Sequence, residues 1–182
     1  HLGILSPDGR CRTFDKNANG YVRGEGVAAV VLKPLQRAVE DGDHIYAVIR
    51  ASGVNHGGRG VSLTAPNPDA QAELLASVYA SAGWPPGSIS FIELHGTATE
   101  LGDSVEAEAL KRAFRAMAER EGTGELSSGY CALGSVKTNI GHLEPAAGVA
   151  GFIKAALAVE KGIIPASLHF EELNPLCGLA GS

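Results

Sequence analysis

The chain has 182 residues, of which 45% are hydrophobic and 19% charged, a balance that is typical of one globular domain with a sizeable core. Its net charge of −5 argues against a nucleic-acid-binding surface, and no apolar run approaches the roughly 20 residues that a membrane span needs. The three cysteines, Cys11, Cys131 and Cys177, are far apart and odd in number, so we expect no disulfide framework and a reducing, cytoplasmic environment.

The first third of the chain is predicted to form a loop, two strands and a short helix. Residues 1–26 are polar and rich in glycine, which indicates a structured loop. The apolar run over 26–33 predicts a buried strand. Pro34 can begin a short helix over 35–40, and the β-branched residues over 45–54 predict a second strand.

The rest of the chain alternates between helices and apolar strands. Apolar residues at helical spacing predict helices over 68–83, 103–119 and 144–161. Short apolar runs predict strands over 88–94 and 130–136. This alternation indicates an α/β fold with a largely parallel sheet that is covered on both faces.

Two histidines lie in similar glycine-rich settings, each shortly after a predicted strand. His95 belongs to the run 93–99, ELHGTAT, and His142 ends the run 135–142, SVKTNIGH. Strand ends of an α/β sheet are where such folds place chemistry, so two of them can bring both imidazoles to one pocket. The alternatives are a pair of hydrogen-bonded core histidines, or a zinc site, which is disfavoured because no close-spaced ligand pair is present.

Several charged residues and cysteines near these motifs allow more than one interpretation. Asp103 and Glu106 lie in the first turn of a predicted helix, where they can simply complement the helix dipole. Lys137 can be a surface lysine. Cys11 lies between two arginines that could lower its pKa, but no helix follows it, whereas Cys131 opens an apolar strand and is expected to be buried and inert.

Three stretches together resemble the β-ketoacyl synthases, and more narrowly the ketosynthase domains of modular type I polyketide synthases. They are residues 14–26, residues 95–106 and residues 134–144. The resemblance implies a thiolase-like fold of αβαβα layers. Residues 1–55 would end its first half and residues 56–182 would supply most of its second half.

A narrower resemblance concerns the subtype. The runs Val54–Gly58 and Thr64–Pro68 are similar to ketosynthases of the trans-acyltransferase type. The degradative thiolases share the fold but do not carry the pattern from Lys137 to His142, so a thiolase is disfavoured.

The resemblance implies a decarboxylative Claisen condensation, in which an acyl-cysteine intermediate is extended by a malonyl thioester held on a carrier protein. His95 and His142 would donate hydrogen bonds to the oxygen on which negative charge develops. Lys137, together with Glu106, would order the site through hydrogen bonds and charge. The residues that would bind the phosphopantetheine arm of the substrate are Thr64, Thr97, Thr99 and Asn139.

The same resemblance implies the partners. We expect the acyl carrier protein, the remaining portion of the ketosynthase domain, and a second copy of the ketosynthase in a homodimer. Nucleic acid and membrane are not expected as partners. No cofactor or metal is expected to bind directly, since the phosphopantetheine arm arrives with the carrier protein.

The sequence departs from the family pattern in three places. The nucleophilic cysteine, in a segment such as Thr-Ala-Cys-Ser-Ser, would precede residue 1, and the glycine-rich oxyanion segment would follow residue 182. Ala98 stands where the family often has glycine. These departures leave a second interpretation open: a non-catalytic, truncated or split ketosynthase that serves as a scaffold for dimerisation and carrier-protein docking.

Overall fold

The computed structural model describes residues 3–58, 66–124 and 126–181. Its elements follow one another in this order: α1 (Leu35–Glu40), α2 (Pro68–Ala82), η1 (Pro86–Ser88), β1 (Phe91–Glu93), α3 (Glu100–Glu121), β2 (Ala132–Gly134), α4 (Lys137–Ile140), η2 (Glu144–Ala146), α5 (Ala147–Lys161) and η3 (Pro175–Cys177). No helix among these described residues is long and apolar enough to cross a lipid bilayer.

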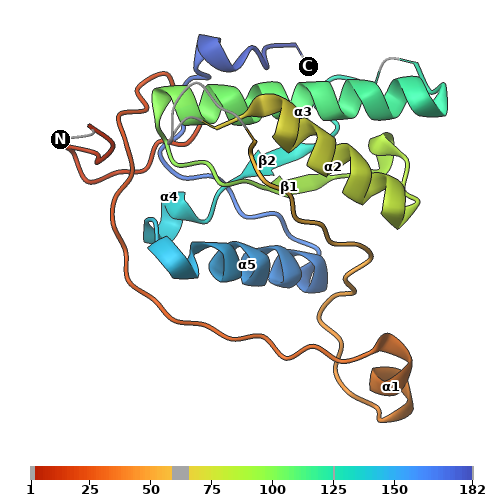
Figure 1. Cartoon of the computed structure of the whole chain (residues 1–182). Coiled ribbons are helices and arrows are strands. Elements are labelled where there is room, and N and C mark those ends of the chain that lie inside the picture. The colour runs from red at the N-terminus through yellow and green to blue at the C-terminus, as the bar shows by residue number, and fades with distance from the viewer. Residues whose placement is uncertain (1–2, 59–65, 125, 182) are drawn as a thin grey trace.

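The two strands form a parallel pair with helices on both sides. The register aligns Phe91 with Ala132 and Glu93 with Gly134. In Figure 1, α2 and α3 lie on one side of the pair and α5 lies on the other. The predicted parallel, doubly covered arrangement is therefore present, although each strand is only three residues long.

The helices begin and end where local chemistry favours it. The side chain of Asn67 accepts the backbone N–H groups of Asp69 and Ala70, and Pro68 occupies the first turn of α2. Both α3 and α5 end at a glycine in the left-handed conformation, Gly122 and Gly162. These bounds agree with the predicted helices to within three residues: α3 begins at Glu100, three residues earlier than predicted, and α5 begins at Ala147, three residues later, after the 3-10 turn η2.

The main core lies where α3 packs against the strands and the N-terminal loop. It comprises the buried residues Phe14, Leu94, Ala107, Leu110 and Cys177. The buried positions of α3 recur at helical spacing, so one apolar face of this helix anchors the loop that follows β1.

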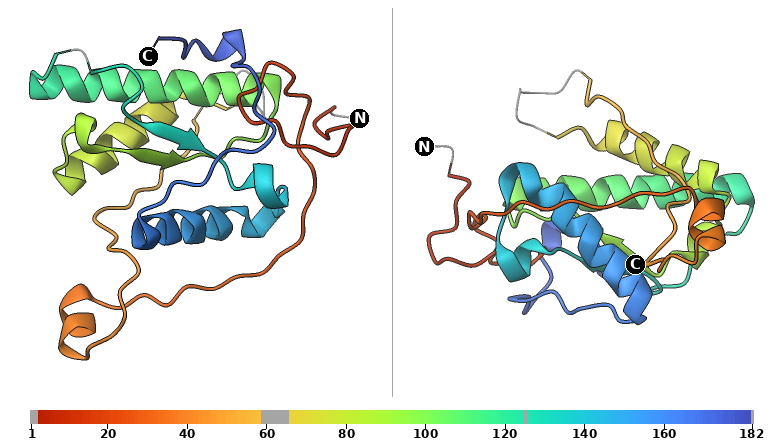
Figure 2. Two further views of the ribbon diagram at one scale, coloured as in Figure 1. Left: turned by 180° about the vertical axis from the view of Figure 1, so that it is seen from behind. Right: turned by 90° about the horizontal axis from the view of Figure 1, so that it is seen from below.

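The two strands predicted over 26–33 and 45–54 are wrong for this structure. The first segment is extended chain that leads past α5 to α1, and the second leads away from α1 (Figure 1 and Figure 2). Neither segment forms a hydrogen-bonded ladder with β1 or β2. Val27 and Val31 are 96% and 97% exposed. A strand needs hydrogen-bonding neighbours, and no strand among the described residues lies beside these segments, so the apolar pattern alone does not produce one.

Candidate active site

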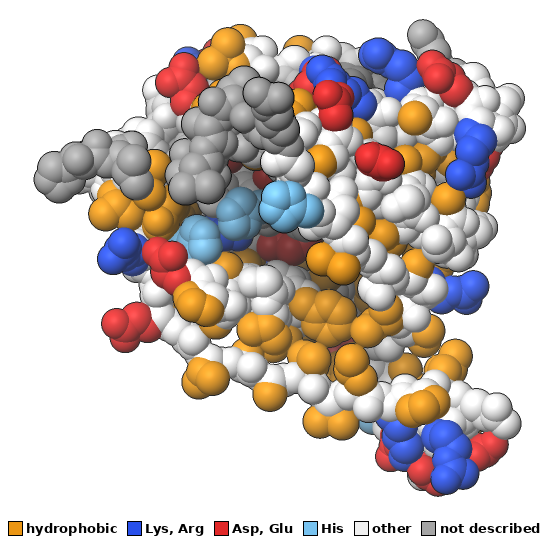
Figure 3. All heavy atoms as spheres, viewed as in Figure 1, with side chains coloured by type: hydrophobic (Ala, Val, Ile, Leu, Met, Phe, Trp, Pro, Cys, Tyr) orange, Lys and Arg blue, Asp and Glu red, His pale blue; other side chains and the backbone are white. Residues whose placement is uncertain are grey.

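The structure brings the two histidines of the sequence motifs together. The ring centroids of His95 and His142 are 5.4 Å apart, and the rings meet edge to face at 88°. This follows from the parallel strands: β1 ends two residues before His95, and β2 leads through α4 toward His142. Figure 3 shows histidine side chains gathered around a hollow on this face of the molecule, with acidic and basic groups deeper inside.

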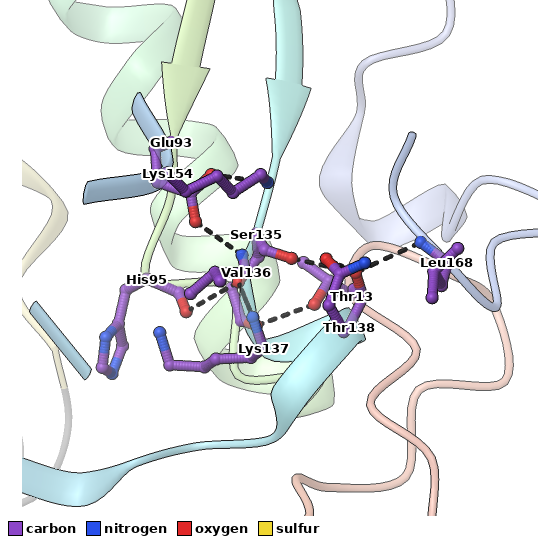
Figure 4. Close-up of polar contacts among 11 residues, drawn as sticks. Thr13, Glu93, His95, Ser135, Val136, Lys137, Thr138, Lys154 and Leu168 are labelled. Carbon is purple, nitrogen blue, oxygen red and sulfur yellow. Dashed lines mark hydrogen bonds and ion pairs between the residues drawn. The ribbon is translucent and has the colours of Figure 1, made fainter. Parts of the chain in front are cut away.

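Lys137 lies behind the histidines and is not a surface lysine. It is 3% exposed, and its side chain extends toward the ring of His95 (Figure 4). Burial lowers the pKa of Lys137, while the negative charges of Glu106 and Glu93 oppose that shift. The ammonium of Lys137 therefore places a positive charge close to the imidazole rings of His95 and His142.

Glu106 fixes the backbone of the loop that carries His95. One carboxylate oxygen accepts the N–H of His95 and the other accepts the N–H of Gly96, each at 2.8 Å. Burial raises the pKa of Glu106, whereas these two backbone bonds and the charge of Lys137 lower it. The link between Glu106 and Lys137 that the resemblance implies is thus a charge interaction across the site.

Both imidazoles are kept neutral near pH 7. Burial, the charge of Lys137 and the neighbouring His142 together lower the pKa of His95 to about 4. Burial and the charge of Lys137 also lower the pKa of His142. A neutral imidazole carries one N–H donor and one acceptor nitrogen, so each ring can donate one hydrogen bond.

The neighbouring backbone selects the tautomer of His142. The N–H of Glu144 donates to Nδ1 of His142 at 2.9 Å, with Glu144 held at a φ of +52°. Because Nδ1 is an acceptor in this bond, the proton of the neutral ring lies on Nε2. The ring also contacts Tyr21, with centroids 4.8 Å apart, which restricts its orientation.

Asp103 clamps two loops and does more than complement the dipole of α3. It is fully buried, and its carboxylate accepts the N–H of Phe14 at 2.8 Å and that of Ala98 at 3.1 Å. Ala98 is also fully buried and has a φ of +58°, a left-handed conformation that glycine adopts with less strain. The alanine at this departure from the family pattern is therefore accommodated at a strained turn.

The residues predicted to bind the phosphopantetheine arm lie in different settings. The hydroxyl oxygens of Thr97 and Thr99 are 3.0 Å apart, beside the start of α3. Asn139 is exposed on α4, where its side chain accepts a hydrogen bond from the hydroxyl of Thr138 at 3.3 Å. Thr64 lies outside the described residues.

The cysteines lack the features of a nucleophile. Burial raises the pKa of all three thiols, that of Cys177 to about 11. Cys11, which the sequence left open as reactive, is buried, and its sulfur accepts the N–H of Val22 at 3.2 Å. Within the described ranges, no cluster of three histidine, cysteine or acidic side chains is arranged to hold a metal ion.

Sequence reasoning did not single out the buried ion pair between Glu93 and Lys154. The carboxylate and the ammonium lie 2.7 Å apart, with both side chains 9% exposed (Figure 4). The available signals were a glutamate at the end of an apolar strand and a lysine beside Ile153, within the otherwise apolar stretch 147–159 of a predicted helix. The two residues are 61 positions apart, so their pairing depends on the fold.

Comparison with known proteins gives consistent matches along the chain. The model of the β-ketoacyl synthase C-terminal domain matches residues 46–171, and the model of the N-terminal domain matches residues 1–38. Polyketide synthase PksN of Bacillus subtilis (strain 168) is 51% identical over 180 residues, which are 99% of this chain and 3% of that protein. A phenolphthiocerol/phthiocerol polyketide synthase of Mycobacterium tuberculosis is also 51% identical over 180 residues, which are 11% of its length.

Solved structures show the same relationship. The ketosynthase from module 6 of the bacillaene synthase of Bacillus subtilis 168 is 44% identical, with a TM-score of 0.88 over 96% of this chain. An oxazolomycin ketosynthase domain of Streptomyces albus JA3453 is 43% identical, with a TM-score of 0.90 over 99% of this chain. The chain spans 30% of each of these two solved chains.

Proposed function

Since this chain belongs to the β-ketoacyl synthase family and carries part of its thiolase-like fold, we propose that it supplies the two-histidine part of a polyketide synthase ketosynthase. The observation that carries the proposal is the close pair of neutral imidazoles, His95 and His142, with ring centroids 5.4 Å apart. The proposed reaction is the decarboxylative Claisen condensation of an acyl-cysteine intermediate with a malonyl thioester.

The chemistry needs a site for developing negative charge. When the malonyl group loses CO2, the electrons of the broken C–C bond pass to the thioester as an enolate. The enolate carbon then attacks the acyl thioester, and the C–S bond to the cysteine breaks so that the thiolate leaves. Fixed N–H donors at the enolate oxygen lower the barrier, and removing one such donor costs about 100-fold or more in rate.

The geometry suits His142 and His95 to this role. Nε2 of His142 carries the proton because Nδ1 is occupied by the N–H of Glu144. The buried ammonium of Lys137 disfavours protonation of both rings, so the donors remain neutral at the pH of the reaction. Glu106 holds the loop of His95 in place, and we assign it and Lys137 to ordering the site.

The remaining assignments are parts of the same proposal. The phosphopantetheine arm of an acyl carrier protein would reach the site past Thr97 and Thr99, with Thr64 and Asn139 as further contacts. The ketosynthase would be a cytoplasmic homodimer that binds no cofactor or metal of its own. Similarity to ketosynthases of the bacillaene synthase supports the trans-acyltransferase subtype. The division of the fold at residue 55 stays a prediction.

The test separates acyl loading from condensation in the complete ketosynthase domain. His142→Ala should lower condensation by about 100-fold or more, while loading of the cysteine, followed by mass spectrometry, survives at least in part. His44→Ala is the matched control, because His44 pairs with Glu160 away from the histidine pair. Condensation by His142→Ala at the wild-type rate would remove His142 from the mechanism.

The same assay decides between an enzyme and a scaffold. A wild-type domain that binds the carrier protein but neither loads nor condenses would support the non-catalytic interpretation. The 182-residue chain alone should form no 3-oxoacyl product, because its three thiols are buried or half-buried and all have raised pKa values.

A further inference from the structure

Glu93 connects the strand before His95 to the turn before Lys137. It is the last residue of β1, and its backbone aligns with Gly134 at the end of β2. Its Oε1 atom accepts the backbone N–H of Val136 at 2.5 Å, immediately before α4 begins at Lys137. One side chain therefore bridges the ends of both strands, just before each delivers a residue of the site.

The other carboxylate oxygen of Glu93 reaches the helix that follows His142. Oε2 lies 2.7 Å from Nζ of Lys154 on α5, and this helix begins at Ala147, five residues after His142. The ammonium also lies 5.4 Å from the ring centroid of Phe91, the first residue of β1. Glu93 thus contacts the turn that leads into α4 and the helix that follows His142, and it belongs to the strand that leads to His95.

The packing around the pair leaves little freedom. A Cβ atom placed on Gly151 of α5 would lie 3.2 Å from Cγ of Glu93, so the helix approaches the side chain closely at this glycine. A carboxylate buried in this way needs both a charge partner and hydrogen-bond donors, which Lys154 and the N–H of Val136 provide.

Stability alone is a weak explanation for such a pair. Well-packed apolar side chains of similar volume commonly replace a buried ion pair without loss of stability, whereas removal of one partner is strongly destabilising. What apolar side chains cannot reproduce is the acceptor that fixes the N–H of Val136. The distinctive contribution of Glu93 is therefore the placement of one strand end relative to the other.

We propose that Glu93 is a positioning residue for condensation, which sets the turn before Lys137 and His142 against the loop of His95 by accepting the N–H of Val136, while Lys154 keeps its charge compensated. This inference rests on the proposed function. Misplacing catalytic groups by about 1 Å can cost up to about 100-fold in rate, so the effect should fall on kcat and not on binding.

Two double variants of the complete ketosynthase isolate the acceptor. Glu93→Gln/Lys154→Met removes both charges but keeps a carbonyl oxygen at position 93, whereas Glu93→Leu/Lys154→Met removes the acceptor as well. We expect the first to retain kcat for condensation within about 3-fold, and the second to lose about 10-fold or more with KM for the malonyl thioester changed less than about 3-fold. If the two folded variants have equal kcat values, whether close to the wild-type value or well below it, the proposal is overturned.

If the leucine variant fails to fold, the same hydrogen bond can be removed by substituting its donor, Val136. Val136→Pro removes the N–H donor at a φ of −59°, which proline adopts, and should lower kcat in the same way. Wild-type kcat in this variant would overturn the proposal. Glu108→Leu/Arg112→Met is the control, because it replaces a more exposed acidic and basic pair on α3, together with their contacts to Lys111 and Asp69, by leucine and methionine and should leave kcat unchanged.

His142→Ala in the same assay separates this inference from the proposed function. If His142→Ala loses condensation while the two Glu93 double variants behave alike, only the role of Glu93 fails. If His142→Ala condenses at the wild-type rate, the proposed function fails with it.

Discussion

The carboxylate of Glu106 accepts the backbone N–H of His95 at 2.8 Å, so a residue of α3 fixes the chain at the point where β1 gives way to the candidate active site. The second oxygen holds the next N–H, that of Gly96, at the same distance. The His95 ring is therefore placed through its own backbone, and Glu106 does not occupy the ring nitrogens.

Glu106→Ala should destabilise the complete ketosynthase by about 3 kcal/mol, because two backbone donors lose their acceptor and each costs about 1–3 kcal/mol when unsatisfied. Glu106→Gln keeps one carbonyl acceptor and should lose less. Denaturant unfolding measures both. Glu108→Ala, on the exposed side of α3, should stay within about 0.5 kcal/mol, and a loss as large as that of Glu106→Ala would contradict the assignment.

The protonation of His95 should make folding depend on pH. Its pKa is lowered from 6.5 to about 4 in the folded protein. Between these values the unfolded chain binds a proton at His95 that the folded chain does not bind, so the free energy of unfolding falls as the pH falls from 6.5 toward 4.

The measurement is denaturant unfolding of the wild type and of His95→Gln at several pH values from about 4 to about 8, a range that spans both the folded and the unfolded pKa of His95. The stability of the wild type relative to the variant should rise with pH up to about 6.5 and then level off. An NMR titration that finds the imidazole of His95 half-protonated near pH 6.5 would show that neither burial nor Lys137 acts on it as inferred.

Asp103 should make the free energy of unfolding depend on pH in the sense opposite to His95. Burial is the main reason that its pKa rises from 3.8 to about 7, against the bonds from the N–H groups of Phe14 and Ala98. Between these pH values the folded chain binds a proton that the unfolded chain does not, so the contribution of Asp103 to stability is full below 3.8 and lost as the pH rises through about 7.

Comparison with Asp103→Asn tests this sign. The stability of the wild type relative to the variant should be greatest near about pH 4 and smallest near about pH 8, because the asparagine does not titrate in this range. A difference that instead grows with pH would mean that the backbone donors, and not burial, dominate the pKa of Asp103.

Local pattern predicted the helices of this chain well. Periodicity together with Asn67 and Gly162 places α2 and α5 within a few residues of their observed bounds. The juxtaposition of His95 and His142 also follows from the sequence, since parallel strands end at one edge of a sheet. The features that were predictable depend on neighbours along the chain or on the general geometry of parallel strands.

The features that were missed depend on partners distant in the sequence. The runs over 26–33 and 45–54 have the composition of strands, but composition does not supply the neighbouring strand that a ladder requires. The pairing of Glu93 with Lys154 spans 61 positions, and the buried clamp of Asp103 on Phe14 spans 89. A charge in a first helical turn looks the same in sequence whether it faces solvent or a loop, so only the fold distinguishes the two.

The strained turn at Ala98 gives a last prediction. Ala98→Gly should change the free energy of unfolding by no more than about 1 kcal/mol. Relief of the left-handed strain, about 1–2 kcal/mol, is offset by the lost methyl group, about 0.8 kcal/mol, and by the greater freedom of glycine in the unfolded chain, about 0.4–1 kcal/mol.

Ala98→Val should instead destabilise by about 3 kcal/mol or more, because a β-branched side chain at a φ of +58° adds backbone strain to the overpacking of a fully buried site. The matched control is Ala109→Val, at a position of α3 that is 1% exposed and has helical backbone, where overpacking applies and the lower helix propensity of valine adds only about 0.6 kcal/mol. Denaturant unfolding of the two variants therefore isolates the backbone contribution. Equal losses at the two positions would show that the turn relaxes out of the left-handed conformation at little cost.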